Sequence, residues 1–137
     1  MPVIKTIPGE ADGAEKVAIL ARPDEAESHW QPVPANGYVE LRVSSDVHQS
    51  VAGIDHGIQV IAPDSFVREH VHPDHDDLLF FYEGEGKTVV EDEDHPVVVG
   101  TSLYVSSGVR HKFVNTSTTQ PLKFTWTLLP GGLSGFF

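Results

Sequence analysis

Short stretches with the residue pattern of β-strands follow one another along most of the chain. Long stretches with helical period are absent. Three β-rich stretches precede residue 73, namely "YVELRVS" from Tyr38, "GIQVIAP" from Gly57 and "FVREHVH" from Phe66. The next, "LLFFYEG" from Leu78, is almost entirely apolar and aromatic, which predicts a strand buried on both faces.

The second half of the chain continues the same pattern. "GKTVV", the acidic stretch "EDEDH" and "PVVVG" predict a hairpin over residues 86–100. Three further strands are expected in "TSLYVSSG", "RHKFVNT" and "LKFTWTLL". Many short strands divided by turn residues favour an all-β sandwich or barrel, and 137 residues suit one domain with a single core.

The first 37 residues differ from the rest, because they are richer in proline, glycine and charge. We expect residues 1–37 to form an N-terminal arm with one or two short edge strands, such as "VIKTI" and "KVAIL", which could cross to a partner subunit. Residues 38–137 are expected to form the barrel and an apolar C-terminal tail. Internal repeats and a second domain are not apparent.

Composition narrows the possible partners. Nine Lys and Arg against 20 Asp and Glu give a net charge of -11, which argues against nucleic acid and anionic membranes as partners. The absence of cysteine excludes disulfides, thiolate zinc sites and cysteine nucleophiles. No apolar run approaches the ~20 residues of a membrane span, and the first 16 residues lack the apolar core of a signal peptide. We therefore expect a cytoplasmic protein.

Histidines and a carboxylate have the spacing of a metal site. His70 and His72 share one face of a predicted strand, and the turn "PDHD" then places Asp77 opposite them. His111 begins a later strand that could close the site. Imidazole and carboxylate together suit a divalent transition metal such as Fe, Mn, Ni, Cu, Co or Zn, and ligand type alone does not choose among them. The alternative is a solvated acidic loop.

The same residues resemble the two conserved motifs of the cupin superfamily. His70-x-His72, four residues, Asp77, six residues and Gly84 have the spacing of the first motif. The second motif is matched by Gly100, Gly108, His111 and Asn115. The resemblance covers residues 57–129. It implies a double-stranded β-helix (the cupin jelly-roll barrel), one bound divalent metal ion, and a homodimer, as is common for such domains.

Three residues depart from the cupin pattern. Asp77 stands where the family has glutamate, and it is one methylene shorter, so it could bind the metal directly, through water, or orient an imidazole instead. His75 is the rival fourth ligand if Asp77 falls short. Asp64 replaces the opening glycine of the first motif, and Ser106 replaces the proline of the second.

An apolar pocket above the metal is expected, although plain barrel core would give the same pattern. Its predicted lining shares faces with Asp77 and His111 or alternates on the last strand: Leu79, Phe81, Phe113, Phe124 and Trp126. Such a pocket suits a small apolar, aromatic or enolic substrate.

Other residues near the predicted site have less defined roles. Arg68 and Arg110 are either anion-binding residues or surface charges, and His48 and His56 could line the mouth of the pocket. The tail carries Gly131 and Gly132 before Leu133, Phe136 and Phe137, so it would either pack onto the barrel or a partner, or close over its mouth as a flap.

The resemblance implies a metal-dependent enzyme, and our first expectation is an oxygenase or dioxygenase. The runner-up is a non-redox cyclase, isomerase or lyase of the polyketide-cyclase kind, in which the metal polarises a carbonyl. In either enzyme Asp77, if it does not bind the metal, could act as a general base. A third possibility is a cupin that binds a small molecule without turnover.

Overall fold

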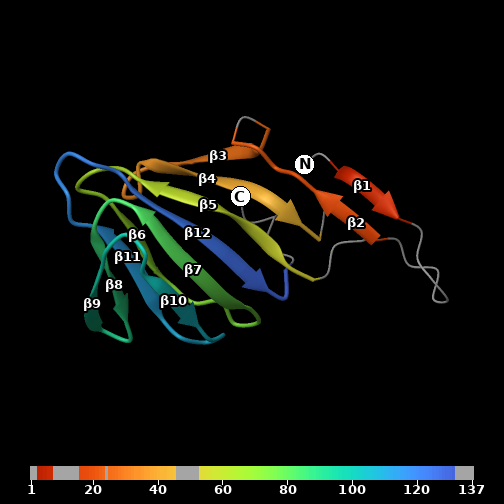
Figure 1. The fold of residues 1–137 in the computed structure, drawn as a ribbon. Helices are drawn as coiled ribbons and strands as arrows, with labels where there is room; N and C mark the ends of the chain where they lie inside the picture. The colour runs from red at the N-terminus through yellow and green to blue at the C-terminus, as the bar shows by residue number, and fades with distance from the viewer. Residues whose placement is uncertain (1–2, 8–15, 24, 46–52, 132–137) are drawn as a thin grey trace.

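The computed structural model describes residues 3–7, 16–23, 25–45 and 53–131 of the chain. These residues form twelve strands and no helix, so the predicted all-β class is confirmed. Accordingly, the described segments include no helix that is long and apolar enough to cross a membrane. Two antiparallel sheets stack on each other, and a small separate hairpin lies beside them (Figure 1).

The larger sheet has six strands in the order β10-β7-β12-β5-β4-β3. Its middle is formed by the three longest pairings, β7 with β12, β12 with β5, and β5 with β4. The strands are β3 (Glu27–Gln31), β4 (Gly37–Ser44), β5 (Asp55–Ile61), β7 (Asp76–Glu83), β10 (Ser102–Val105) and β12 (Leu122–Leu129).

The smaller sheet has four strands in the order β6-β11-β8-β9. They are β6 (Phe66–His70), β8 (Gly86–Val90), β9 (Glu93–Val97) and β11 (His111–Asn115). The predicted hairpin is β8–β9, but its second strand begins at Glu93 and not at Pro96. The turn is shorter than the acidic stretch suggested, because Glu91 and Asp92 both adopt positive φ and form a tight two-residue connection.

The inner faces of the two sheets enclose the core. On β7, Leu79 and Phe81 are buried, whereas Leu78, Phe80 and Tyr82 are exposed on the outer face. The prediction that this strand is buried on both faces was therefore wrong. Its outer residues are large and apolar, which hides the alternation in the sequence, but no described element covers that face of the sheet.

The N-terminal region forms the separate hairpin and one edge strand of the six-stranded sheet. β1 (Val3–Ile7) and β2 (Lys16–Ile19), both at segments expected to be strands, pair with each other in the separate hairpin. β3, which we had assigned to the arm without predicting a strand, pairs with β4 at the edge of the six-stranded sheet. The arm therefore adds a strand to the larger sheet.

Glycines of the two sequence motifs occupy turns with positive φ. Asp64, which replaces the opening glycine of the first motif, also has positive φ. Gly84, Gly100 and Gly108 have φ of 88°, 94° and 81°. Asp64 has φ of 58°, and its N–H donates a hydrogen bond to the Ser117 carbonyl. Because Asp enters the left-handed region more readily than most residues, the turn before β6 is kept without glycine.

Asn115, the last residue of the second motif, ties three segments together. Its side-chain NH2 donates to the carbonyls of Ile61, Ala62 and Gln120, and its side-chain oxygen accepts from the Ser117 N–H. Asn115 is buried, so these hydrogen bonds are shielded from water. They fix the end of β11 against the end of β5 and explain why the position takes an asparagine.

Candidate metal centre and cavity

The three predicted histidine ligands lie together at one end of the four-stranded sheet. His70 ends β6, His72 follows it by two residues, and His111 begins β11 directly opposite His70. One ligand atom from each ring lies within 4.8 Å of the other two. Strand pairing therefore unites residues that are far apart in the chain into a group that could hold a metal ion.

Backbone carbonyls fix the orientation of two of the rings. The Nδ1 of His70 lies 2.8 Å from the Arg68 carbonyl oxygen, and the Nδ1 of His111 lies 2.9 Å from that of Val109. Each Nδ1 must donate its proton to the carbonyl, which leaves the Nε2 lone pair free to bind a metal. The Nε2 of His111 is buried and has no hydrogen-bond partner among the described residues, which is costly unless a ligand satisfies it.

The electrostatic setting keeps all three imidazoles neutral. Burial lowers the pKa of His72 to about 4, helped by the neighbouring His70 and His75. Burial and the proximity of His70 lower the pKa of His111 to about 4, and burial lowers the pKa of His70. A neutral imidazole is the form that binds a metal ion, so the group is ready to do so at neutral pH.

Asp77 faces the histidines from the other sheet. It lies on β7, is only 4 % exposed, and lines the same cavity as His70 and His72. It does not belong to the close group of three ligand atoms. Its Oδ1 is buried without a hydrogen-bond partner in the described part of the chain, and burial raises the pKa of its carboxyl to about 7 despite a hydrogen bond from the Thr127 backbone.

The rival ligand and the other histidines are placed elsewhere. The Nδ1 of His75 contacts the carbonyl oxygen of Pro130 at the start of the tail, and His75 lines no part of the cavity. His56 is bonded to the Thr127 hydroxyl at 2.8 Å and also lies outside the cavity lining. His48 and the tail from residue 132 onward lie outside the described residues, so their predicted roles stay predictions.

A cavity of about 330 Å³ lies between the sheets beside the histidines. Four of the five predicted pocket residues line it: Leu79, Phe113, Phe124 and Trp126. Phe81 does not, because it packs one step deeper, with its ring centroid 5.0 Å from that of Phe124 and 6.3 Å from that of Phe113. Taken as a whole, the wall is mostly apolar in exposed surface, so a bound substrate would be screened from water.

Sequence reasoning missed two amides in the cavity wall, Gln31 and Gln59. Gln59 shares the inward face of β5 with the buried Ile61, so an inward polar residue in an apolar strand was the available indication. Gln31 had none, because β3 was not predicted as a strand.

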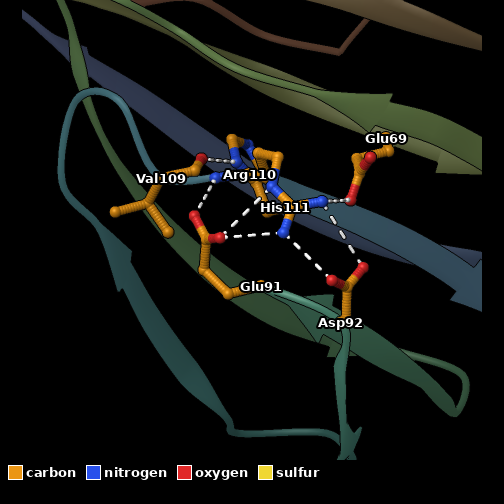
Figure 2. A network of polar contacts seen from close by, with 6 residues as sticks. All are labelled: Glu69, Glu91, Asp92, Val109, Arg110 and His111. Atoms are coloured by element: carbon orange, nitrogen blue, oxygen red, sulfur yellow. Dashed lines mark hydrogen bonds and ion pairs between the residues drawn. The ribbon is translucent and has the colours of Figure 1, made fainter.

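Arg110 belongs to the outer surface near the metal group and not to the cavity. Its guanidinium is within 3.4 Å of carboxylate oxygens of Glu69, Glu91 and Asp92. Figure 2 shows Glu91 and Glu69 on opposite sides of it and Asp92 below it. The backbone N–H of Arg110 also donates to Glu91, at 2.9 Å. Arg110 thus fastens the β8–β9 turn to the start of β11, beside His111, and is a surface charge with partners of its own.

The fold and the site can now be compared with known proteins. The sequence profile of the cupin domain family matches residues 57–128, which is more than half of the chain. The chain belongs to the cupin family. A curated relative, Protein SchB from Streptomyces halstedii, is 30 % identical over 64 residues. The match spans 47 % of this chain and 46 % of that protein, so less than half of SchB's length is matched.

Solved structures confirm the double-stranded β-helix of this cupin. A predicted oxalate decarboxylase from Thermotoga maritima superposes with a TM-score of 0.67 at 21 % identity, covering 80 % of this chain and 97 % of that one. The polyketide cyclase RemF from Streptomyces resistomycificus also has a TM-score of 0.67, at 14 % identity over 80 % of this chain and 77 % of RemF. KdgF from Halomonas sp. has a TM-score of 0.65 at 14 % identity, covering 82 % and 94 %. All three neighbours are under 25 % identical to this chain, so they establish its fold alone.

Proposed function

We propose that this cupin is a metal-dependent enzyme that moves a proton on a small, apolar substrate bearing an enolisable carbonyl, as a cyclase or an isomerase does. One observation carries the proposal: Asp77 on one sheet faces three neutral imidazoles on the other across an apolar cavity, and its Oδ1 has no hydrogen-bond partner among the described residues. The histidines that could hold a metal ion and the carboxyl that could act as a general base therefore border the same cavity, which is large enough for a small substrate.

The histidines fit a divalent ion such as Zn, Fe, Mn, Ni or Cu. His70, His72 and His111 would hold it, because their rings are neutral and converge, and the buried Nε2 of His111 needs a partner. Such an ion, when bound, supplies Lewis-acid polarisation of a substrate carbonyl. Asp77 remains on the opposite wall as the group that exchanges protons with the substrate.

The role of Asp77 follows from its surroundings. In the metal-free protein, burial raises the pKa of the Asp77 carboxyl to about 7. A cation held by the histidines would lower this pKa and favour the carboxylate, which is the form that accepts a proton. Its carboxylate would take a proton from the carbon next to the carbonyl, and the electron pair of that C–H bond would pass to the carbonyl oxygen as an enolate. The same carboxyl would then return the proton to another atom of the substrate. Because burial opposes the charged form, the pKa of Asp77 lies closer to the working pH than that of an exposed aspartate, which favours both steps.

An oxygenase, our first expectation, remains the second candidate. The observation in its favour is that three protein ligands leave coordination positions for a substrate oxygen and for O2. An oxygenase, however, does not require a proton-transfer residue such as Asp77 on the wall opposite the metal. Binding without turnover is the third candidate.

An isotope-exchange experiment separates the three. Untagged protein, with its ion identified by elemental analysis, is incubated with 2-acetylnaphthalene in D2O under argon, and loss of the methyl proton resonance is followed by NMR. We expect protein-dependent exchange that falls by about 10²-fold or more in Asp77→Asn. His95→Ala, in the exposed β9 strand, is the matched control and should exchange like the wild type.

Other results would change the assignment. Products that form only in air, with stoichiometric uptake of O2, would establish the oxygenase and contradict the proposal. Saturable binding of the probe without exchange under argon or O2 uptake in air would favour the binding protein. Exchange that is undiminished in Asp77→Asn would remove Asp77 as the base.

A further inference from the structure

The cavity continues outward into a second hollow. This groove, of about 400 Å³, is lined chiefly by the segment that connects β3 to β4 and by Phe66. Three residues line both spaces: Gln31, Val67 and Arg68. The two hollows therefore meet at these residues, which form the mouth of the cavity.

Arg68 stands out at this mouth because its charge is not compensated. Arg22 lies 3.1 Å from Glu25, Arg42 lies 2.7 Å from Glu40, and Arg110 has three carboxylates. In the part of the chain that the structure describes, the Arg68 side chain has neither an ion pair nor a hydrogen bond, and it is exposed. A protein with a net charge of -11 offers many carboxylates, yet none of those that the structure describes pairs with this guanidinium.

A second donor lies at the same mouth. Gln59 donates its side-chain N–H to the Oε1 of Gln31 at 2.7 Å. This bond fixes the carboxamide of Gln31, whose own NH2 has no partner within the described segments. Glu69 also borders the cavity, but its carboxylate lies 3.3 Å from Arg110. The mouth thus offers hydrogen-bond donors, whereas the interior is mostly apolar.

We propose that Arg68 and Gln31 form a carboxylate-binding subsite, and that the substrate carries a carboxylate at the end that lies in the mouth. The planar guanidinium matches a carboxylate by two parallel hydrogen bonds, and the Gln31 NH2 would add a third. The orientation of the substrate, with its enolisable carbonyl toward the histidines and its carboxylate outward, rests on the proposed function. The anion subsite itself does not.

The subsite defines a substrate class. The ligand is an elongated organic anion whose apolar middle fits between Leu79, Phe124 and Trp126, and a neutral analogue of the same shape binds more weakly. The surface of the protein repels anions in general, so the preference must arise locally from Arg68.

Calorimetric titration with two matched probes tests this subsite. The probes are 6-acetyl-2-naphthoate and its neutral methyl ester, titrated into the full-length protein as purified and again with excess EDTA. The variants are Arg68→Gln, Arg68→Lys and Arg22→Gln, the last being an exposed arginine that changes the net charge equally. We expect Arg68→Gln to raise the Kd for the naphthoate by about tenfold or more. The Kd of Arg68→Lys should lie between those of the wild type and Arg68→Gln. The ester should bind equally to all, and Arg22→Gln should behave as the wild type.

The proposal is overturned by an unchanged naphthoate Kd in Arg68→Gln, by an equal loss in Arg22→Gln, or by a lack of measurable naphthoate binding to the wild type. A preference for the naphthoate that disappears with EDTA would place the carboxylate at the histidines, which also contradicts the subsite. An Arg68-dependent preference in a protein that catalyses no proton exchange would support the subsite and refute the proposed function. Proton exchange in a protein that shows no Arg68-dependent preference for the naphthoate would support the proposed function and refute the subsite.

Discussion

The two sheets of this barrel contribute differently to the site that they enclose. The four-stranded sheet and the loop after β6 supply the converging rings of His70, His72 and His111. Backbone carbonyls hold the rings of His70 and His111. The six-stranded sheet supplies most of the apolar wall and, on β7, the buried carboxyl of Asp77. One sheet is suited to hold an ion, and the other to hold a substrate and exchange its protons.

This division means that metal binding and substrate chemistry depend on separate residues. A change in the four-stranded sheet should alter metal content first, and a change in the six-stranded sheet should alter the cavity without removing the ion. The following predictions test that separation.

The largest effect is expected from His111→Ala. The variant should retain less than about a tenth of the wild-type metal after purification without a histidine tag, because it loses a buried ligand atom that no neighbour replaces. Elemental analysis measures the ion, and far-ultraviolet circular dichroism checks the β-structure. His95→Ala, from the same sheet but exposed, should keep its full metal content. Full metal in His111→Ala would show that the triad does not hold the ion.

Adjacent leucines on β7 test the inner face of the six-stranded sheet. Leu79 is 1 % exposed and lines the cavity, whereas Leu78 is 44 % exposed on the outer face. Leu79→Ala should lower the free energy of unfolding in urea by about 2–5 kcal/mol, and Leu78→Ala by less than about 1 kcal/mol. Metal content should be unchanged in both. Equal losses of stability would mean that the outer face of β7 is covered in solution.

Asp77→Asn should change the pH dependence of stability in the metal-free protein. Burial raises the pKa of Asp77 from 3.8 to about 7, so between these values the folded state holds a proton that the unfolded state releases. The wild-type free energy of unfolding therefore falls as pH rises through this window, and asparagine removes that loss. Relative to the wild type, the variant should gain roughly 2–4 kcal/mol between pH 4 and pH 8. Urea unfolding in EDTA at several pH values measures it, and parallel pH profiles would contradict the raised pKa.

The sequence predicted those parts of the fold that depend on local pattern and motif spacing. The strand class followed from alternation, and the grouping of His70 with His111 followed from the motif register. β3 was missed because "ESHWQ" has too few apolar residues to mark a strand, and it forms through pairing with β4. The exposed outer face of β7 was missed because an all-apolar strand conceals which residues point inward.

The site was predictable only where residue type reveals a role. Histidines at fixed spacing indicate a ligand set, but nothing in the sequence distinguishes Phe81, behind the cavity wall, from Phe113 and Phe124, which form it. Similarly, Arg68 and Arg110 cannot be distinguished in the sequence, because each lies within two residues of a predicted ligand, His70 or His111. The three-dimensional pairing of β8 and β11 surrounds Arg110 with carboxylates and gives Arg68 none.

The turn between β8 and β9 shows a compromise that is familiar from protein design. Glu91 and Asp92 adopt φ of 47° and 69°. Asn-Gly is the favoured pair for this conformation, which costs most other residues about 1 kcal/mol each. The chain instead has two carboxylates there, and both bind Arg110, the neighbour of His111. A redesign that optimised this turn for backbone propensity alone would improve the hairpin but remove the carboxylates that hold Arg110, leaving backbone pairing to join the hairpin to the strand that carries the third histidine.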